Sequence, residues 1–192
     1  INGVAWDAVE LPSQFMENWC WEPQALAFIS GHHETGEPLP AALLDKVMAA
    51  KNFQSAMMMV RQVEFSLFDF RLRCEFDPQQ TQQIQRVLDE VRAQVAVIQA
   101  APFNRFQHGF GHIFGGGYAA GYYSYKWAEV LSADAFSRFK ADGIFNRQTG
   151  ERFLSSVLEQ GGSEEPMDMF VAFMGRKPEI TALLRQEGIL EQ

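Results

Sequence analysis

Acidic, amide and aromatic side chains near the start of the sequence have the spacing of one helix face. Glu10, Gln14, Glu17 and Trp21 follow one another at intervals of four, three and four residues, so a helix places them in one stripe. Carboxylates beside aromatic rings are unusual on a solvated face, because a buried charge needs a partner. Two interpretations stay open: a buried or metal-bound carboxylate, or acids that are exposed or accept hydrogen bonds from helix N-terminal N–H groups.

A second candidate site combines a histidine, a glycine run and three tyrosines. These residues are His112, Gly115, Gly116, Gly117, Tyr118, Tyr122 and Tyr125. The tyrosine spacing of four and three residues predicts three phenols on one helix face. The glycines allow the backbone to approach a ligand closely and free the N–H groups that follow. Phenols and an imidazole can donate hydrogen bonds to a developing oxyanion. The alternative is a stripe of packed aromatic rings whose hydroxyl groups reach the solvent.

Two further histidine pairs have metal-ligand spacing but an unsuitable local sequence. Residues 33–37 (HETGE) resemble H-E-x-x-H with the last histidine replaced, a motif that needs a helix to bring its ligands to one face. Gly36 and Pro38 disfavour that helix. His108 and His112 are four residues apart, with glycines between them. We therefore expect neither pair to bind a metal.

The composition indicates one globular domain and excludes several classes of function. With 47 % hydrophobic and 21 % charged residues among 192, the chain can form a core. A net charge of −8, without a dense basic run, argues against binding to nucleic acid or to an anionic membrane. Cys20 and Cys74 are too few for a disulfide framework, which favours a cytoplasmic location. The first residues match neither a signal peptide nor an initiator methionine, so we expect a fragment of a longer protein.

Hydrophobic periodicity, proline and glycine predict an all-α fold in a single domain, residues 1–192. Tyr118 is expected to open a long helix, and Asp77-Pro78 to cap another whose apolar positions end at Ile98. The segment from 31 to 40 is expected to be a loop, and Gly175 to end a helix. The predicted helices cover residues 11–22, 23–29, 41–50, 53–73, 77–98, 118–140, 152–160, 166–174 and 178–186.

Four stretches of this sequence resemble the thimet oligopeptidase and oligopeptidase A family of zinc metallopeptidases, and its bacterial oligopeptidase A branch most of all. The stretches are residues 4–14, 35–40, 112–127 and 173–178, and the likeness covers the whole chain. The resemblance implies a largely helical enzyme with a deep channel that admits short peptides. This chain would then be the multi-helix C-terminal part of a zincin-type oligopeptidase catalytic domain.

The resemblance also implies roles for individual residues. In the family, one zinc ion is bound by two histidines of an H-E-x-x-H helix and by a glutamate on a following helix, which corresponds to Glu10; Asp7 would support that ligand. Tyr125 matches the tyrosine that stabilises the tetrahedral oxyanion, with His112 beside it. Residues matching substrate-binding positions are His112, Tyr118 and Tyr122, together with Gly116 and Gly117 of the glycine run.

One departure from the family pattern limits what this chain is expected to do. The 192 residues contain no H-E-x-x-H, which the family places upstream of the position of Ile1. We therefore expect zinc binding to be weak or absent in the isolated chain, and peptide hydrolysis to be negligible. Apolar surface left by a half-channel is expected to contact the upstream part of the same peptidase, or to drive self-association. The alternatives are a non-catalytic peptide-binding helical module and a helical scaffold without a site.

Overall fold

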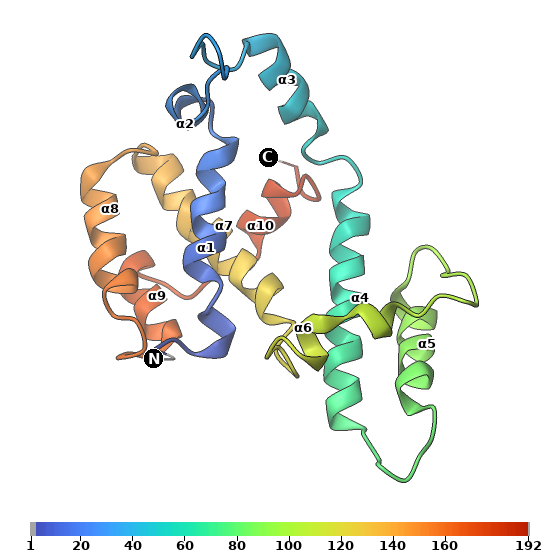
Figure 1. Ribbon diagram of the computed structural model, residues 1–192. Helices are drawn as coiled ribbons and strands as arrows, with labels where there is room; N and C mark the ends of the chain where they lie inside the picture. The colour runs from blue at the N-terminus through green and yellow to red at the C-terminus, as the bar shows by residue number, and fades with distance from the viewer. Residues whose placement is uncertain (1–2, 192) are drawn as a thin grey trace. The chain divides into compact units, whose positions relative to one another are not determined.

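The computed structural model describes residues 3–191, and every regular element in that range is helical (Figure 1). The prediction of an all-α fold is confirmed. The chain divides into two compact parts. We call Ile1–Ser55 with Trp127–Gln192 the terminal part, and Ala56–Lys126 the central part; each is described by itself. Among the described residues, no helix has the length and apolarity needed to cross a bilayer.

The terminal part contains helices from both ends of the sequence. Proline opens α1, α2 and α9 within the first two helical positions, where its missing N–H is not needed. The left-handed Gly175 (φ 80°) ends α9, as predicted. The elements are η1 (Trp6–Ala8), α1 (Leu11–Glu17), η2 (Asn18–Trp21), α2 (Pro23–Ile29), α3 (Ala41–Ala50), α7 (Ser124–Asp142, from Trp127 onward), α8 (Arg147–Phe153), η4 (Leu154–Leu158), α9 (Pro166–Met174) and α10 (Thr181–Gln186).

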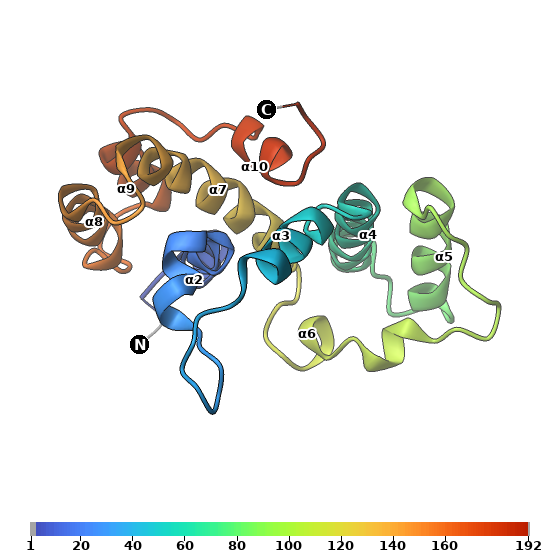
Figure 2. The ribbon, with the colours of Figure 1, turned by 90° about the horizontal axis from the view of Figure 1, so that it is seen from above.

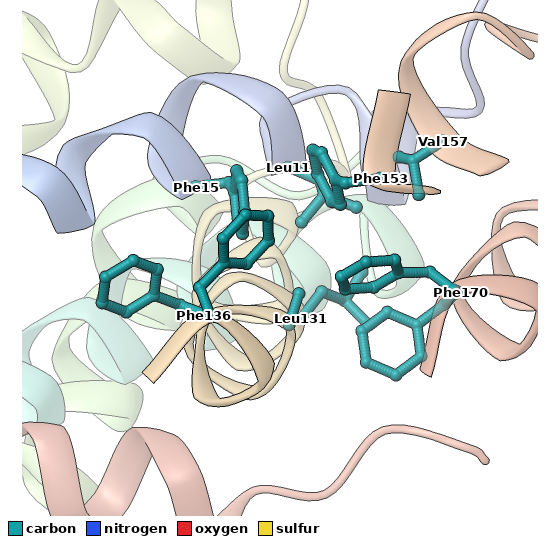
Figure 3. Close-up of a cluster of buried hydrophobic side chains, with 10 residues drawn as sticks. Leu11, Phe15, Leu131, Phe136, Phe153, Val157 and Phe170 are labelled. Atoms are coloured by element: carbon teal, nitrogen blue, oxygen red, sulfur yellow. The ribbon is translucent and has the colours of Figure 1, made fainter. Parts of the chain in front are cut away.

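Aromatic side chains from α1, α7, α8 and α9 meet in the core of the terminal part (Figure 3). Phe15 is 1 % exposed; its ring stacks on that of Phe153 at 4.0 Å and meets that of Phe139 edge-on at 5.5 Å. Figures 1 and 2 show α8 and α9 beside α7. Asn18, the first residue of η2, links this element to α7 by donating a hydrogen bond to the Ser132 hydroxyl at 2.9 Å. Burial of these rings stabilises the terminal part by about 1.5–3 kcal/mol per side chain.

The central part is organised by two neighbouring helices, α4 (Ser55–Cys74) and α5 (Gln83–Val95), which lie side by side (Figures 1 and 2). Their shared core also receives residues from the short elements η3 (Phe106–Gly109) and α6 (Gly111–Phe114). A buried ion pair joins the two long helices, with Arg92 Nε 3.0 Å from Glu64 Oε1. The core residues are Phe65, Phe68, Leu72, Val87, Leu88, Val91, Phe110 and Ile113.

Several predicted helix boundaries are confirmed and others are wrong. The predicted bounds of α3 and α9 match the observed ones, and residues 31–40 form the expected loop. Asp77 does not cap α5; its carboxylate accepts a hydrogen bond from the Gln79 amide at 3.0 Å and forms a separate turn. The helix begins only after the left-handed Gln82 (φ 60°). Helix α8 begins earlier than predicted because the side chain of Asn146 accepts a hydrogen bond from the Thr149 amide at 3.1 Å.

Candidate active site

The tyrosine segment is a turn rather than the predicted start of a helix. Residues 115–123 form successive turns, and α7 begins only at Ser124. Gly117 (φ 86°) and Ala120 (φ 57°) are left-handed, a conformation that interrupts a helix. The Ala120 and Tyr122 amides donate to the carboxylate of Asp69, at 2.9 and 3.1 Å, instead of to helical carbonyls. The prediction that Tyr118 opens a helix is therefore wrong.

The turn nevertheless brings the four predicted aromatic side chains together. Tyr118 stacks on Tyr125 with ring centroids 4.9 Å apart, and Tyr122 meets Tyr125 edge-on at 5.3 Å. The His112 ring lies 5.9, 5.8 and 6.0 Å from the rings of Tyr118, Tyr122 and Tyr125. We call these four residues the His/Tyr cluster. It gathers an imidazole and three phenols, all of which can donate hydrogen bonds, at one place in the central part.

The His/Tyr cluster is anchored on one side and open on the other. Tyr122 packs edge-on against Phe65 and Phe110, at 6.0 and 5.0 Å, and its hydroxyl donates to Gln62 Oε1 at 2.9 Å. Tyr125 is partly exposed, and His112 is exposed on the short helix α6. The imidazole and the phenol of Tyr125 are therefore accessible from outside, while the core holds Tyr122 in place.

Two glycines shape the backbone beside the cluster. A Cβ atom on Gly116 would lie 3.1 Å from His112 Cα and 3.2 Å from the carbonyl oxygens of Gly111 and His112, which is too close for ordinary packing. Gly117 has the left-handed conformation noted above, which glycine adopts without steric cost. The Gly116 amide donates to the Gly111 carbonyl at 2.7 Å. The loop therefore folds tightly back onto the turn that carries His112.

The inner face of α4 supports this loop, a role that the sequence interpretation missed. Gln62, Asp69 and Arg73 are seven and four residues apart, so they lie along one side of the helix. Gln62 accepts from the Tyr122 hydroxyl, Asp69 accepts from two loop amides, and Arg73 donates to the Ile113 carbonyl. A signal was available in the sequence, because these three polar side chains share one side of the predicted helix 53–73.

The proposed metal ligand belongs to the terminal part. Glu10 is half-buried at the N-terminal end of α1, and its Oε2 accepts a hydrogen bond from the Ser13 hydroxyl at 3.0 Å. Asp7 is half-buried in η1. Gln14 follows on the same face, and its buried Oε1 accepts no hydrogen bond from the described residues. Glu17, the last residue of α1, is exposed. The burial of the acidic stripe therefore does not extend to this residue.

The described residues do not complete a zinc site by themselves. Within residues 3–191, no group of three or more histidine, cysteine, aspartate or glutamate side chains could hold a metal ion. His33 and Glu34 are strongly exposed and lie in a turn, which confirms that this segment is not helical. His108 and His112 occupy two separate short helices, η3 and α6. Glu10 can supply one oxygen ligand, whereas a catalytic zinc normally has three protein ligands.

Comparison with known proteins identifies relatives over almost the whole chain. The profile of peptidase family M3 matches residues 1–189. Oligopeptidase A of Salmonella typhimurium and that of Escherichia coli are each 64 % identical over 189 residues, covering 98 % of this chain and 28 % of their own length. A probable cytosolic oligopeptidase A of Arabidopsis thaliana is 46 % identical over 194 residues, covering 99 % and 28 %. The chain therefore spans less than a third of these curated relatives.

Proposed function

Because the chain belongs to peptidase family M3, we propose that it is the C-terminal part of the catalytic domain of a zinc-dependent oligopeptidase. In the complete enzyme the substrates would be short peptides, and the reaction would be hydrolysis of an internal peptide bond. The bound zinc would supply Lewis-acid activation of a water molecule. Glu10 is the one zinc ligand that we assign to this chain, with Asp7 beside it, and the two histidine ligands would come from outside its 192 residues.

The observation that carries the proposal is the convergence of the His/Tyr cluster beside a glycine loop. Tyr125 and His112 would donate hydrogen bonds to the oxyanion that develops at the attacked carbonyl, where preorganised donors lower the barrier most. Tyr118 and Tyr122, with the backbone at Gly116 and Gly117, would bind the extended peptide. The sequence match to the oligopeptidases supports this assignment, because it includes the segment from residue 112 to residue 125.

Two proteins test the proposal together. The first is the isolated chain, assayed with a quenched fluorogenic peptide, with zinc added and with a chelator control. We expect no zinc-dependent cleavage, because the chain has only one assigned ligand. Robust, chelator-sensitive cleavage would show that the ligand assignment is wrong.

The second protein is a chimera in which this chain replaces the matching segment of Escherichia coli oligopeptidase A. At 64 % identity over 189 residues, the segment is expected to fit its new context. We expect the chimera to cleave the peptide with zinc and to lose activity on Glu10→Gln. Glu17→Gln is the matched control, because Glu17 is exposed on the same helix. A folded, zinc-loaded chimera that binds the peptide without cleaving it would instead support a non-catalytic peptide-binding module.

Exposed apolar side chains support a further part of the proposal. Phe28 and Phe53 of the terminal part are 68 % and 76 % exposed, and Ile98 and Phe103 of the central part 72 % and 83 %. We assign the exposed apolar side chains of each part to contact with the upstream part of the same peptidase, and expect the isolated chain to self-associate. Sedimentation velocity should therefore show dimers or larger species for the isolated chain, and a monomer for the chimera.

We place the complete enzyme in the cytoplasm. Both cysteines, Cys20 and Cys74, are free and exposed in this structure, an arrangement suited to a reducing compartment. The cytosolic designation of the Arabidopsis relative supports the same location. Fractionation of cells that produce the full-length protein tests it directly, and recovery in the periplasmic or membrane fraction would contradict it.

A further inference from the structure

Asp69 is a fully buried carboxylate whose main partners are two backbone amides of the tyrosine turn. Its exposure is 0 %. Oδ1 accepts a hydrogen bond from the Ala120 amide at 2.9 Å, and Oδ2 accepts one from the Tyr122 amide at 3.1 Å. Arg73, one helical turn further along α4, lies 3.8 Å from Oδ1. A buried charge is costly without such partners, so these contacts fix both the carboxylate and the turn.

The two amides that donate to Asp69 belong to Ala120 and Tyr122, which are separated by one residue. This spacing determines the path of the loop. A carboxylate can accept from both only if the backbone between them turns its N–H groups toward the same point. The left-handed Ala120 (φ 57°) produces this geometry, a conformation that is sterically unfavourable for alanine. Since nothing local favours that conformation in alanine, the hydrogen bonds to Asp69 offset its cost.

Asp69 also fixes the ring that organises the rest of the His/Tyr cluster. Tyr122 follows the turn directly, and its ring contacts those of His112 and Tyr125 at 5.8 and 5.3 Å. Gln62 holds the Tyr122 hydroxyl at 2.9 Å, so α4 fixes this residue at both its backbone and its tip. On the other side of the glycine loop, Arg73 donates to the Ile113 carbonyl, next to His112.

We propose that Asp69 is a positioning residue for peptide hydrolysis: its carboxylate holds residues 120–122 so that the Tyr122 ring keeps Tyr125 and His112 together, facing the substrate. This inference rests on the proposed function. Asp69 does not touch the substrate and acts through the turn. An asparagine cannot replace it, because its amide N–H₂ would face one of the two backbone N–H groups, placing donor against donor.

The test uses the chimera described above, with Asp69→Asn compared with Glu64→Gln. Glu64 is the matched control because it is also a buried carboxylate on α4 and is paired with Arg92 at 3.0 Å. Among the described residues, it forms no hydrogen bond or ion pair with the tyrosine turn. We expect Asp69→Asn to lower kcat by about tenfold or more, with zinc content unchanged and a smaller change in KM. Glu64→Gln should lower the unfolding temperature but leave kcat unchanged at 25 °C, because the loss of one buried hydrogen-bonded pair outside the tyrosine turn leaves the protein folded at that temperature.

A double-mutant cycle distinguishes positioning from general damage. If Asp69 acts through the donor at Tyr125, Asp69→Asn should have a smaller effect in a Tyr125→Phe background, because coupled residues are not additive. Wild-type kcat in Asp69→Asn, or an equal loss of kcat in Glu64→Gln, would overturn the proposal. If the effects of Asp69→Asn and Tyr125→Phe on kcat were fully additive, Asp69 would not act through Tyr125.

Hydrogen exchange gives a readout that does not need catalysis. In Asp69→Asn, mass spectrometry should show at least about tenfold faster exchange in residues 118–124, as expected when an amide loses its acceptor, with no change in residues 83–95 of α5. If Asp69→Asn yields no folded chimera, Asp69→Glu takes its place, because it keeps the charge but displaces the oxygens by one methylene group. An inactive wild-type chimera would overturn the proposed function alone. Unchanged exchange in residues 118–124 would overturn the role of Asp69.

Discussion

The rings of Tyr118 and Tyr125 stack with centroids 4.9 Å apart and planes inclined by 19°, although only Tyr125 lies in a helix. A helix would have placed these side chains along one face, as their spacing predicts. A turn held by Asp69 brings them together instead. The contact depends on a residue about fifty positions earlier in the sequence.

Removal of the Tyr125 hydroxyl is expected to impair catalysis and not binding. In the chimera, Tyr125→Phe should lower kcat by about 10²–10³-fold, the loss typical of one oxyanion donor, with little change in KM. Tyr123→Phe is the matched control, because the Tyr123 ring packs against Phe70 at 5.2 Å and not against the His/Tyr cluster. Steady-state kinetics with one fluorogenic peptide measures both. Equal losses in the two variants would contradict the role of Tyr125.

A methyl group on Gly116 is expected to displace the loop. The added Cβ would lie 3.1 Å from His112 Cα, so Gly116→Ala should cost about 1–3 kcal/mol in local strain and lower kcat/KM in the chimera. Gly109→Ala is the control, because a Cβ there meets no atom within 4 Å. Similar kcat/KM values for Gly116→Ala and the wild-type chimera would show that the loop can relax without consequence.

Truncation of Phe15 is expected to destabilise the terminal part. Phe15 is 1 % exposed, and Phe15→Ala should cost about 3–5 kcal/mol. The neighbouring Met16→Ala should change stability by less than about 0.5 kcal/mol, because Met16 is 53 % exposed. Urea unfolding followed by tryptophan fluorescence measures both, since all four tryptophans belong to the terminal part. A loss below 1 kcal/mol for Phe15→Ala would mean that the core repacks.

The Asp134–Arg176 pair is expected to fix the segment after α9. Asp134 is 1 % exposed and accepts two hydrogen bonds from Arg176, at 2.7 and 2.6 Å, and one from the Glu179 amide at 2.8 Å. Arg176→Met should lower the free energy of unfolding by an amount near the lower end of the range of about 3–5 kcal/mol, because the arginine side chain itself is 41 % exposed.

A surface pair provides the control for this measurement. Arg147→Met should leave the urea midpoint unchanged, since the side chains of Arg147 and Glu151 are 91 % and 61 % exposed and such pairs contribute little. The same tryptophan signal measures both variants. Equal midpoints for Arg176→Met and the wild-type chain would show that the buried carboxylate tolerates the loss of its partner.

Asp142 is expected to make the free energy of unfolding fall as the pH is lowered into the acid range. The hydrogen bond from Arg138 at 2.6 Å, with a second from the Thr149 hydroxyl, lowers the pKa of Asp142 below its ordinary value of 3.8. The folded state therefore favours the ionised form, and this contribution is present above pH 3.8 and is lost as the pH falls through the lowered pKa.

An NMR titration of the Asp142 carboxyl group measures this shift. Arg138→Gln should raise the midpoint toward 3.8, because the strongest stabilising hydrogen bond is removed. Arg147→Gln should not move it, since Arg147 pairs with Glu151. A midpoint unchanged by Arg138→Gln would contradict the assigned cause.

The sequence by itself determined the fold class and most helix positions. Prolines at Pro12, Pro23 and Pro166 and the left-handed Gly175 mark helix ends through local backbone restrictions, so these boundaries can be predicted without knowledge of the packing. The motif around Glu10 and the His112–Tyr125 segment indicated the family for a similar reason, because specific side chains at fixed spacing carry that information along the chain.

The tertiary structure alone decided how the His/Tyr cluster is assembled. Helical spacing predicted a shared face, but a buried carboxylate on α4 attracts the amides of Ala120 and Tyr122 and replaces the helix by a turn. Asp69 is 51 and 53 residues away in sequence from these partners. Helix propensity and local spacing cannot predict a hydrogen bond between residues so far apart in the sequence. Local rules failed where a long-range polar contact outweighed them, and that place is the candidate active site.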